Sequence, residues 1–310
     1  MDPKGGSELQ LAFLNKHVKK DLLDKFSITL SVPESKPLDK NKINILWLKN
    51  SYNQPNLMPW FSDKKNHDKY DWYVFNSHWS YEKFRMAYDV PTKRCVVIKN
   101  GLGPVKLKTN FYKKGDKLRI LYHSTPWRGL NVLLGAMQLV KSNVELDVYS
   151  STQIYGDHFK KEFDHEYADL YKQAEDLPNV NYMGYQDHQY LVDNLPTYDA
   201  LVYPSIFEET FCNAAVEALA CGLFMVCTNY GALFETCGEF PVYVPYEDDY
   251  EKLSRQFAFA IDEIPNQLAQ PACIDQLKFQ QKYFNYFYTW EKKKMDWINF
   301  LTGVSNARTK

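Results

Sequence analysis

The stretch that most constrains the fold is residues 200–237, ALVYPSIFEETFCNAAVEALACGLFMVCTNYGALFETC. An apolar run at 200–203 ends at Pro204, and an Ala-rich run at 211–220 is stopped by Gly222. A second apolar run of strand length, 223–227, follows it. We therefore predict a strand, a polar loop, a helix and a strand. This order points the free N–H groups of the helix toward the carboxyl edge of a parallel sheet, where α/β folds bind anionic ligands.

The composition indicates an ordinary globular protein. The 310 residues are 45% hydrophobic, and the chain is long enough for two domains of typical size. Its formal net charge of −1 provides no overall positive potential that would attract nucleic acid. Six cysteines without a CxxC pair argue against a zinc site or a disulfide framework. No apolar run approaches the ~20 residues that span a bilayer, and the start lacks the apolar core of a signal peptide. We expect a cytoplasmic protein, at most peripheral to a membrane.

Strand-like and helix-like runs alternate in both halves of the chain, which predicts parallel α/β sheets. In the first third, apolar runs predict strands at 26–32, 43–48, 72–76 and 95–98. Residues 101–117 carry Gly, Pro and a Lys cluster, as a linker does. Further strands are predicted at 118–122, 146–149, 180–183 and 242–244. A cleft between two such domains is a favoured ligand site.

The first residues, Gly5-Gly6-Ser7-Glu8, admit two interpretations of equal weight. A Gly-Gly-Ser turn ahead of a helix would let a ligand approach the backbone closely. Alternatively, Ser7 caps the helix and Gln10, three residues on, completes a capping box.

Several blocks in order carry a family resemblance. They are Gly5-Gly6-Ser7-Glu8, Asn76-Ser77, Asn100-Gly101, STPWRGLNVLL (124–134), VNYMGY (180–185) and YPSIFEETFCNAAVEALACG (203–222). With these blocks the chain resembles a retaining glycosyltransferase of the GT-B fold, family 4-like (glycosyl transferases group 1). The resemblance implies two Rossmann-like domains that face a cleft. Residues 1–105 would form the acceptor-side domain and 106–288 the nucleotide-sugar domain, with a C-terminal helix at about 289–310 crossing back to the N-terminal domain.

The resemblance assigns roles to two glutamates separated by seven residues, Glu209 and Glu217. Glu217 would bind the ribose hydroxyls, since it lies roughly 9 Å beyond Phe211 at ~1.5 Å per helical residue. Glu209 would contact the donor sugar as a catalytic residue, and the backbone of Thr210, Phe211 and Cys212 would face the sugar and the diphosphate. Taken alone, the two glutamates favour the other interpretation, in which both are solvated surface residues.

The remaining donor-side candidates surround a phosphate and a base. Arg128 is the candidate to neutralise the leaving diphosphate, because a guanidinium matches phosphate geometry. Relatives place a second basic group nearby; here the sequence has His123-Ser124, and either His123 or a lysine elsewhere could replace it. The turn at Gly184 and Tyr185 is expected to receive the nucleobase, while Gly6 and Ser124 complete the donor-binding set.

On the acceptor side the candidates are Lys49 and His78, since the histidine that relatives carry after the second strand is absent here. The resemblance implies no metal and no cofactor; the partners would be a nucleotide diphosphate-sugar donor and a carbohydrate or lipid-linked acceptor. Three functions remain open. They are a glycosyltransferase acting on a hydroxyl of a glycan, polysaccharide or glycolipid, a catalytically silent glycosyltransferase-like subunit that binds a partner enzyme or glycan, and a GT-B nucleotide-sugar epimerase.

Overall fold

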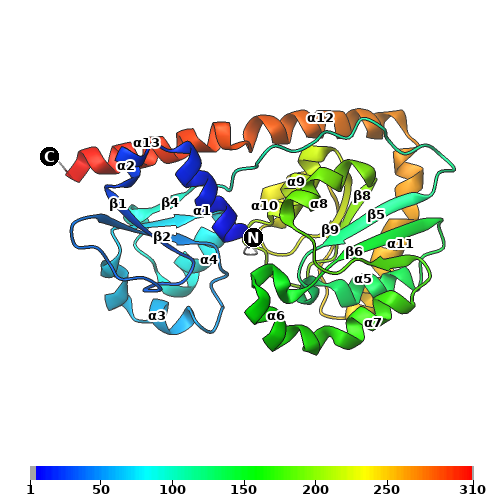
Figure 1. Ribbon diagram of the computed structural model, residues 1–310, viewed down its shortest axis with the longest axis horizontal. Helices are drawn as coiled ribbons and strands as arrows, with labels where there is room; N and C mark the ends of the chain where they lie inside the picture. Colours follow the sequence, from blue (N-terminus) through cyan, green and yellow to red (C-terminus); the bar gives the residue numbers. More distant parts are fainter. Residues whose placement is uncertain (1–4, 309–310) are drawn as a thin grey trace. The chain divides into compact units, whose positions relative to one another are not determined.

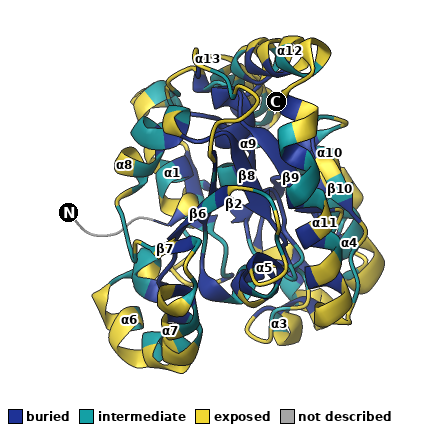
Figure 2. Ribbon diagram, turned by 90° about the vertical axis from the view of Figure 1, so that its right-hand side faces the viewer, coloured by how far each residue is buried: buried dark blue, intermediate teal, exposed yellow. Residues whose placement is uncertain are grey.

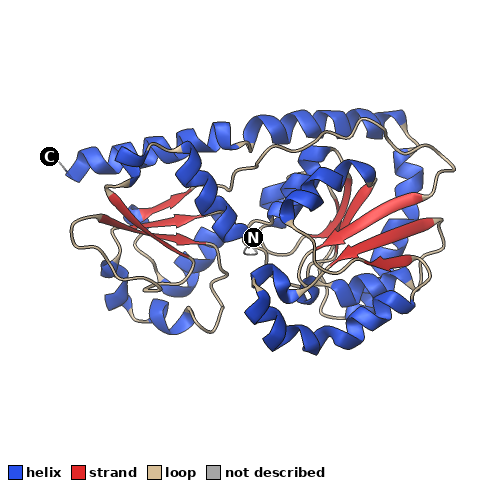
Figure 3. Ribbon diagram, viewed as in Figure 1, coloured by secondary structure: helices blue, strands red, loops and turns tan. Residues whose placement is uncertain are grey.

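The computed structural model describes residues 5–308 and divides into two compact units. The N-terminal unit contains Gly6–Gly103, Glu209–Phe211 and the chain from Phe287 onward. The C-terminal unit contains Pro104–Glu208 and Cys212–Tyr286, together with Gly5. Each unit holds one parallel sheet flanked by helices (Figures 1 and 3), which confirms the predicted α/β class.

The sheet of the N-terminal unit has the order β1-β2-β3-β4, and all neighbouring pairs are parallel. Its strands are β1 (Phe26–Leu30), β2 (Ile43–Leu48), β3 (Trp72–Phe75) and β4 (Cys95–Val97). The four predicted strands are thus confirmed to within two residues at their ends. All six residues of β2 are buried, as expected for a parallel strand covered on both faces.

Alternate side chains of β2 enter two separate cores of this unit. Ile45 and Trp47 join the core formed with α1 (Gly6–His17), α2 (Lys20–Leu23) and α13 (Trp290–Arg308), where the Trp47 and Trp297 rings lie 4.6 Å apart. Leu46 and Leu48 join the opposite core with α3 (Met58–Ser62) and α4 (His78–Tyr88). The last helix therefore packs on the N-terminal sheet, in accordance with the predicted GT-B architecture.

Helix α1 differs from both interpretations of the first residues. It begins at Gly6, so no Gly-Gly-Ser turn precedes it and Ser7 lies inside its first turn instead of capping it. Gln10 is 2% exposed and serves another purpose. Its Nε2 donates to the Gly101 carbonyl (2.8 Å) and its Oε1 accepts from the Gly101 N–H (3.0 Å). This pair fixes the loop that follows β4.

The sheet of the C-terminal unit has six parallel strands in the order β7-β6-β5-β8-β9-β10. They are β5 (Leu118–His123), β6 (Val144–Tyr149), β7 (Val180–Tyr182), β8 (Ala200–Tyr203), β9 (Phe224–Thr228) and β10 (Val242–Val244). Counted from the first strand of this unit, the order is 3-2-1-4-5-6, that of the doubly wound dinucleotide-binding fold. The topology therefore has a switch point between β5 and β8.

Helices cover both faces of this sheet (Figure 1). On one side lie α5 (Leu130–Met137), α7 (Ala168–Asp176) and α11 (Tyr250–Leu268), and on the other α8 (His188–Asn194) and α9 (Asn213–Cys221). The segment expected as a loop plus a helix, 150–176, contains α6 (Asp157–Phe163) and two 3-10 turns in addition to α7. Short α10 (Leu233–Cys237) and long α12 (Pro271–Phe287) complete the set. Figure 2 shows buried strands beneath partly exposed helices.

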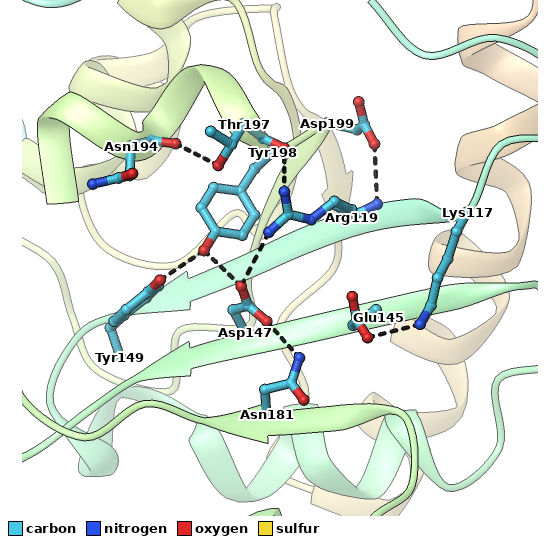
Figure 4. A network of polar contacts seen from close by, with 10 residues as sticks. All are labelled: Lys117, Arg119, Glu145, Asp147, Tyr149, Asn181, Asn194, Thr197, Tyr198 and Asp199. Atoms are coloured by element: carbon cyan, nitrogen blue, oxygen red, sulfur yellow. Dashed lines mark hydrogen bonds and ion pairs between the residues drawn. The ribbon is translucent and has the colours of Figure 1, made fainter.

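A polar network stabilises the middle of this sheet (Figure 4). Asp147 on β6 accepts from the Tyr198 hydroxyl (2.6 Å) and from the Asn181 amide (2.8 Å). The Tyr149 and Tyr198 hydroxyls are 2.7 Å apart, and the Arg119 guanidinium lies 5.0 Å from the centre of the Tyr198 ring. Because Asp147 is 6% exposed, these donors satisfy a carboxylate that would otherwise be costly to bury.

No helix between residues 5 and 308 is long and apolar enough to cross a membrane.

Candidate functional site

The loops that follow β5 and β8 meet at the switch point, where doubly wound sheets bind ligands. Gly129 ends the first loop with φ +101, and a Cβ built there would lie 1.9 Å from the Pro204 carbonyl oxygen of the second. Only glycine tolerates both the left-handed backbone and this close approach. The Ser124 and Tyr203 hydroxyls, 3.2 Å apart, connect the first loop to the end of β8.

Arg128 immediately precedes this contact, in a 3-10 turn over Pro126–Arg128. Its guanidinium lies 4.6 Å from the centre of the Phe207 ring, which belongs to the loop after β8. Stacking on an aromatic face orients a guanidinium while leaving its edge N–H groups directed outward in the ring plane. Phe207 is a positioning residue that the sequence pattern does not reveal.

Helix α9 begins two residues later than predicted. Cys212 is its N-cap with φ +75, a left-handed backbone that breaks the helix, so the first helical residue is Asn213 and not Phe211. Glu217 then lies four residues beyond the helix start, roughly 6 Å along the axis at ~1.5 Å per residue instead of the expected 9 Å. The carboxylate is therefore closer to the positive, N-terminal end of α9 than the sequence indicated.

Side-chain amides from α12 hold the other end of α9. Gln280 donates to the Leu219 carbonyl (3.0 Å), Gln281 to the Cys221 carbonyl (2.6 Å) and Asn285 to the Ala220 carbonyl (2.8 Å). These carbonyls are among the last four of the helix, which have no i+4 partner within it. The Leu219 carbonyl also accepts from the N–H of the C-cap Gly222 (3.1 Å). The three amides therefore fix the axis of α9.

Glu217 is paired with a residue that sequence reasoning missed. His188, the first residue of α8, places its Nε2 2.8 Å from Oε1 of Glu217. The Glu217 side chain is 6% exposed and that of His188 is 39% exposed. The carboxylate holds the pKa of His188 above its ordinary value, against the opposing effect of burial. The sequence feature that could have pointed to His188 is its position at the start of the helix that follows the Gly184 turn.

His123 does not provide a second positive charge near Arg128. It ends β5 and is 8% exposed, and burial lowers its pKa to about 4, so the ring is neutral at pH 7. Four buried polar atoms at or just after the ends of β5 and β6 have no hydrogen-bond partner among residues 5–308: His123 Nε2, Thr125 Oγ1, Ser150 Oγ and Thr152 Oγ1. Buried polar atoms are usually satisfied, so this edge of the sheet has capacity for a polar ligand.

The turn after β7 has the geometry that its glycine predicts. Gly184 has φ +62, and nothing lies within 4 Å of a Cβ built on it. Glycine is therefore favoured here by the left-handed backbone and not by a close contact. The Tyr185 hydroxyl donates to Asp187 (3.3 Å), which orients the ring beside the start of α8.

In the N-terminal unit, residues 209–211 close a polar cluster with the ends of β2 and β3. The Thr210 hydroxyl donates to the Lys49 carbonyl (2.8 Å) and accepts from the Asn76 amide (3.1 Å). The Lys49 ammonium donates to Asn100 and lies 3.9 Å from the centre of the Trp47 ring. Burial holds the pKa of Lys49 well below its ordinary value. Glu209 is buried, so it is not a solvated surface glutamate.

The predicted site residues are distributed over both units. Ser124, Arg128, Gly184, Tyr185, Cys212 and Glu217 belong to the C-terminal unit. Gly6, Lys49, His78, Glu209, Thr210 and Phe211 belong to the N-terminal unit, where His78 is exposed at the start of α4. Across residues 5–308, no group of three or more His, Cys, Asp or Glu side chains could hold a metal ion.

Comparison with known proteins shows which family profile and which solved structures this chain is similar to. Residues 118–263, from β5 into α11, match the sequence profile of the family described as Glycosyl transferases group 1. No curated protein gives a match. The chain is similar in structure to a glycosyltransferase from Rickettsia africae ESF-5, with a TM-score of 0.67 and 14% identity over 98% of this chain and 83% of that one.

Two further solved structures share the architecture. One is sucrose-phosphate synthase from Thermosynechococcus elongatus, with a TM-score of 0.65 and 18% identity over 97% of this chain and 78% of that one. The other is HepE of Anabaena in complex with UDP and glucose, with a TM-score of 0.61 and 15% identity over 84% and 72% of the two chains.

The fold is that of the GT-B glycosyltransferases, and the profile match lies in its C-terminal unit. Residues 118–263 are similar to the group 1 glycosyltransferases, in accordance with the resemblance inferred from the sequence motifs.

Proposed function

We propose that this chain transfers a sugar from a nucleotide diphosphate-sugar to a hydroxyl group of a glycan, polysaccharide or glycolipid, with retention of anomeric configuration. The observation that carries the proposal is the switch-point edge of the C-terminal sheet. There, the start of α9, Arg128 and the nearly buried carboxylate of Glu217 accompany buried polar atoms without partners. Retention is taken from the family resemblance. The domain roles, 1–105 for the acceptor and 106–288 for the donor, belong to the same proposal.

The chemistry requires stabilisation of charge on the leaving group. As the bond from the anomeric carbon to the phosphate oxygen breaks, the diphosphate keeps the electron pair. The acceptor oxygen bonds to that carbon and its proton passes to the departing diphosphate. The positive end of the α9 dipole and the Arg128 guanidinium would offset the growing negative charge. Glu217 would accept hydrogen bonds from the ribose, and the turn at Gly184 and Tyr185 would receive the base. The proposed transfer needs neither metal nor cofactor.

The polar cluster of the N-terminal unit supports its role with the acceptor. Glu209 and Thr210 would contact the donor sugar, and Thr210 is hydrogen-bonded to the backbone of Lys49. Lys49 and, at the exposed start of α4, His78 would then contact the acceptor.

The test begins with donor hydrolysis. UDP is the first nucleotide to use, because HepE was solved with it. The protein is incubated with UDP-, ADP- and GDP-sugars, with and without EDTA, and the release of nucleoside diphosphate is measured. Release that is unaffected by EDTA supports the proposal. No release with any donor or acceptor, and no nucleotide-induced rise in melting temperature, would favour the silent subunit. Conversion of the free nucleotide sugar to its epimer would favour the epimerase.

Two substitutions locate the site. Glu217→Ala should weaken UDP binding about 10- to 100-fold, the usual effect of losing hydrogen bonds to a charged group. Arg128→Ala should lower turnover about 10²- to 10³-fold, because it removes a donor that stabilises transition-state charge. Arg255→Ala is the matched control, since this half-exposed arginine pairs with Glu251 on α11. Wild-type kinetics in Arg128→Ala would mean that the diphosphate binds elsewhere.

A further inference from the structure

We propose that His188 supplies the second positive charge of the donor site: as an imidazolium on Glu217, it strengthens binding of the donor's diphosphate. The inference rests on the proposed function, because it assumes that a nucleotide diphosphate binds at the start of α9. It assigns to His188 the electrostatic role that the sequence left open between His123 and a lysine.

The geometry gives the pair a shared role. A nearly buried Glu217 carboxylate four residues inside α9 would repel a diphosphate at the helix start. His188 contacts one oxygen of that carboxylate at 2.8 Å, which leaves the second oxygen to accept from ribose hydroxyls. Protonated His188 cancels the charge of Glu217 and fixes its rotamer, so the ribose contact and the diphosphate no longer oppose each other.

The charged groups around His188 favour the imidazolium. From α9, Glu217 is the largest influence and raises the pKa of His188. From the end of β5, His123 is neutral at pH 7 because of its own low pKa of about 4 and so does not repel the imidazolium there. Along α8 itself, Asp187 accepts from Tyr185 and Asp193 pairs with Lys106 at 3.1 Å. Glu217 is therefore the counter-ion on which the state of His188 depends.

Binding of an anion beside His188 must raise the pKa of this residue further, and linkage then makes nucleotide affinity depend on pH. A rise of one pKa unit corresponds to about tenfold tighter binding when His188 is charged. The terminal phosphate of UDP itself titrates near pH ~6. The informative quantity is therefore the ratio of the dissociation constants of a variant and the wild type at each pH, in which the titration of UDP cancels.

The experiment measures UDP binding by calorimetry from pH 6 to pH 9 for the wild type, His188→Gln and His188→Lys. Glutamine keeps a hydrogen-bond donor without the charge, and lysine keeps the charge at every pH. We expect His188→Gln to bind about tenfold more weakly than the wild type at pH 6 and nearly equally at pH 9. His188→Lys should bind tightly over the whole range. His158→Gln is the control, because His158 forms a surface pair with Glu162 and its side chain is 94% exposed.

Each other outcome overturns the inference. If His188→Gln binds like the wild type at every pH, His188 contributes no charge, while the proposed function stands. If His188→Gln is weaker by one constant factor and lysine does not restore binding, the residue is only structural. If the wild type binds none of UDP, ADP and GDP, the proposed donor site fails as well. Thermal melts of all variants identify any loss of folding.

Discussion

Replacement of Gly129 by alanine tests whether the contact of the two switch-point loops shapes the site. The new Cβ would lie 1.9 Å from the Pro204 carbonyl oxygen, a backbone atom that cannot turn away, and the residue would keep φ +101. A left-handed backbone costs about 1–2 kcal/mol for alanine. Overpacking adds about 1–3 kcal/mol, so the sum is about 2–5 kcal/mol of lost stability.

Gly115 provides a matched control for the backbone cost. It has φ +100 in the same unit, and nothing lies within 4 Å of a built Cβ. Gly115→Ala should therefore cost only about 1–2 kcal/mol. Thermal unfolding of both variants, followed by UDP binding, measures the difference. Because Arg128 adjoins Gly129, the clash should also weaken nucleotide binding in Gly129→Ala and leave it unchanged in Gly115→Ala. Equal melting temperatures for the two variants would refute the close approach of the loops.

Two other predictions concern buried polar groups. Burial lowers the pKa of Lys49 in the folded protein. Between this lowered pKa and the ordinary lysine value of 10.5, the unfolded chain binds more protons than the folded protein. The free energy of unfolding should therefore rise with pH over this range. Lys49→Met should therefore raise the melting temperature at pH 7, with the gain shrinking toward pH 10; a lower melting temperature would show instead that Asn100 and the Trp47 ring compensate the charge. Tyr198→Phe should destabilise the protein by about 1–3 kcal/mol, because Asp147 and Tyr149 each lose a hydrogen-bond partner. Denaturant unfolding against Tyr155→Phe, a half-exposed tyrosine, checks this, and equal losses would contradict it.

Local patterns in the sequence determined the secondary structure closely. Apolar runs located all four strands of the N-terminal sheet and the strands from Leu118 onward. The signal is clearest for β2, β8 and β9, because a parallel strand buried on both faces favours an unbroken apolar run. The Gly222 stop of α9 was also predictable, since glycine readily adopts its φ of +96. The spacing of Glu209 and Glu217, read with the other blocks, indicated the family whose profile residues 118–263 match.

The start of α9 shows where local reasoning failed. The run from Phe211 looks helical, but Phe211 is 2% exposed in a core and Cys212 adopts a left-handed backbone. A single non-glycine residue with positive φ has no sequence signature, because tertiary packing imposes it. The two-residue shift moved Glu217 nearer to the helix start.

The sequence by itself determined the α/β class, the strands and the two glutamates assigned to the donor. Only the tertiary structure decided that β5 lies beside β8, that Phe207 stacks on Arg128 and that His188 and not His123 pairs with Glu217. The physical reason is separation along the chain. Periodicity reports the surroundings of neighbouring residues, whereas the His188–Glu217 contact joins residues 29 positions apart and exists only once the sheet has brought α8 and α9 together.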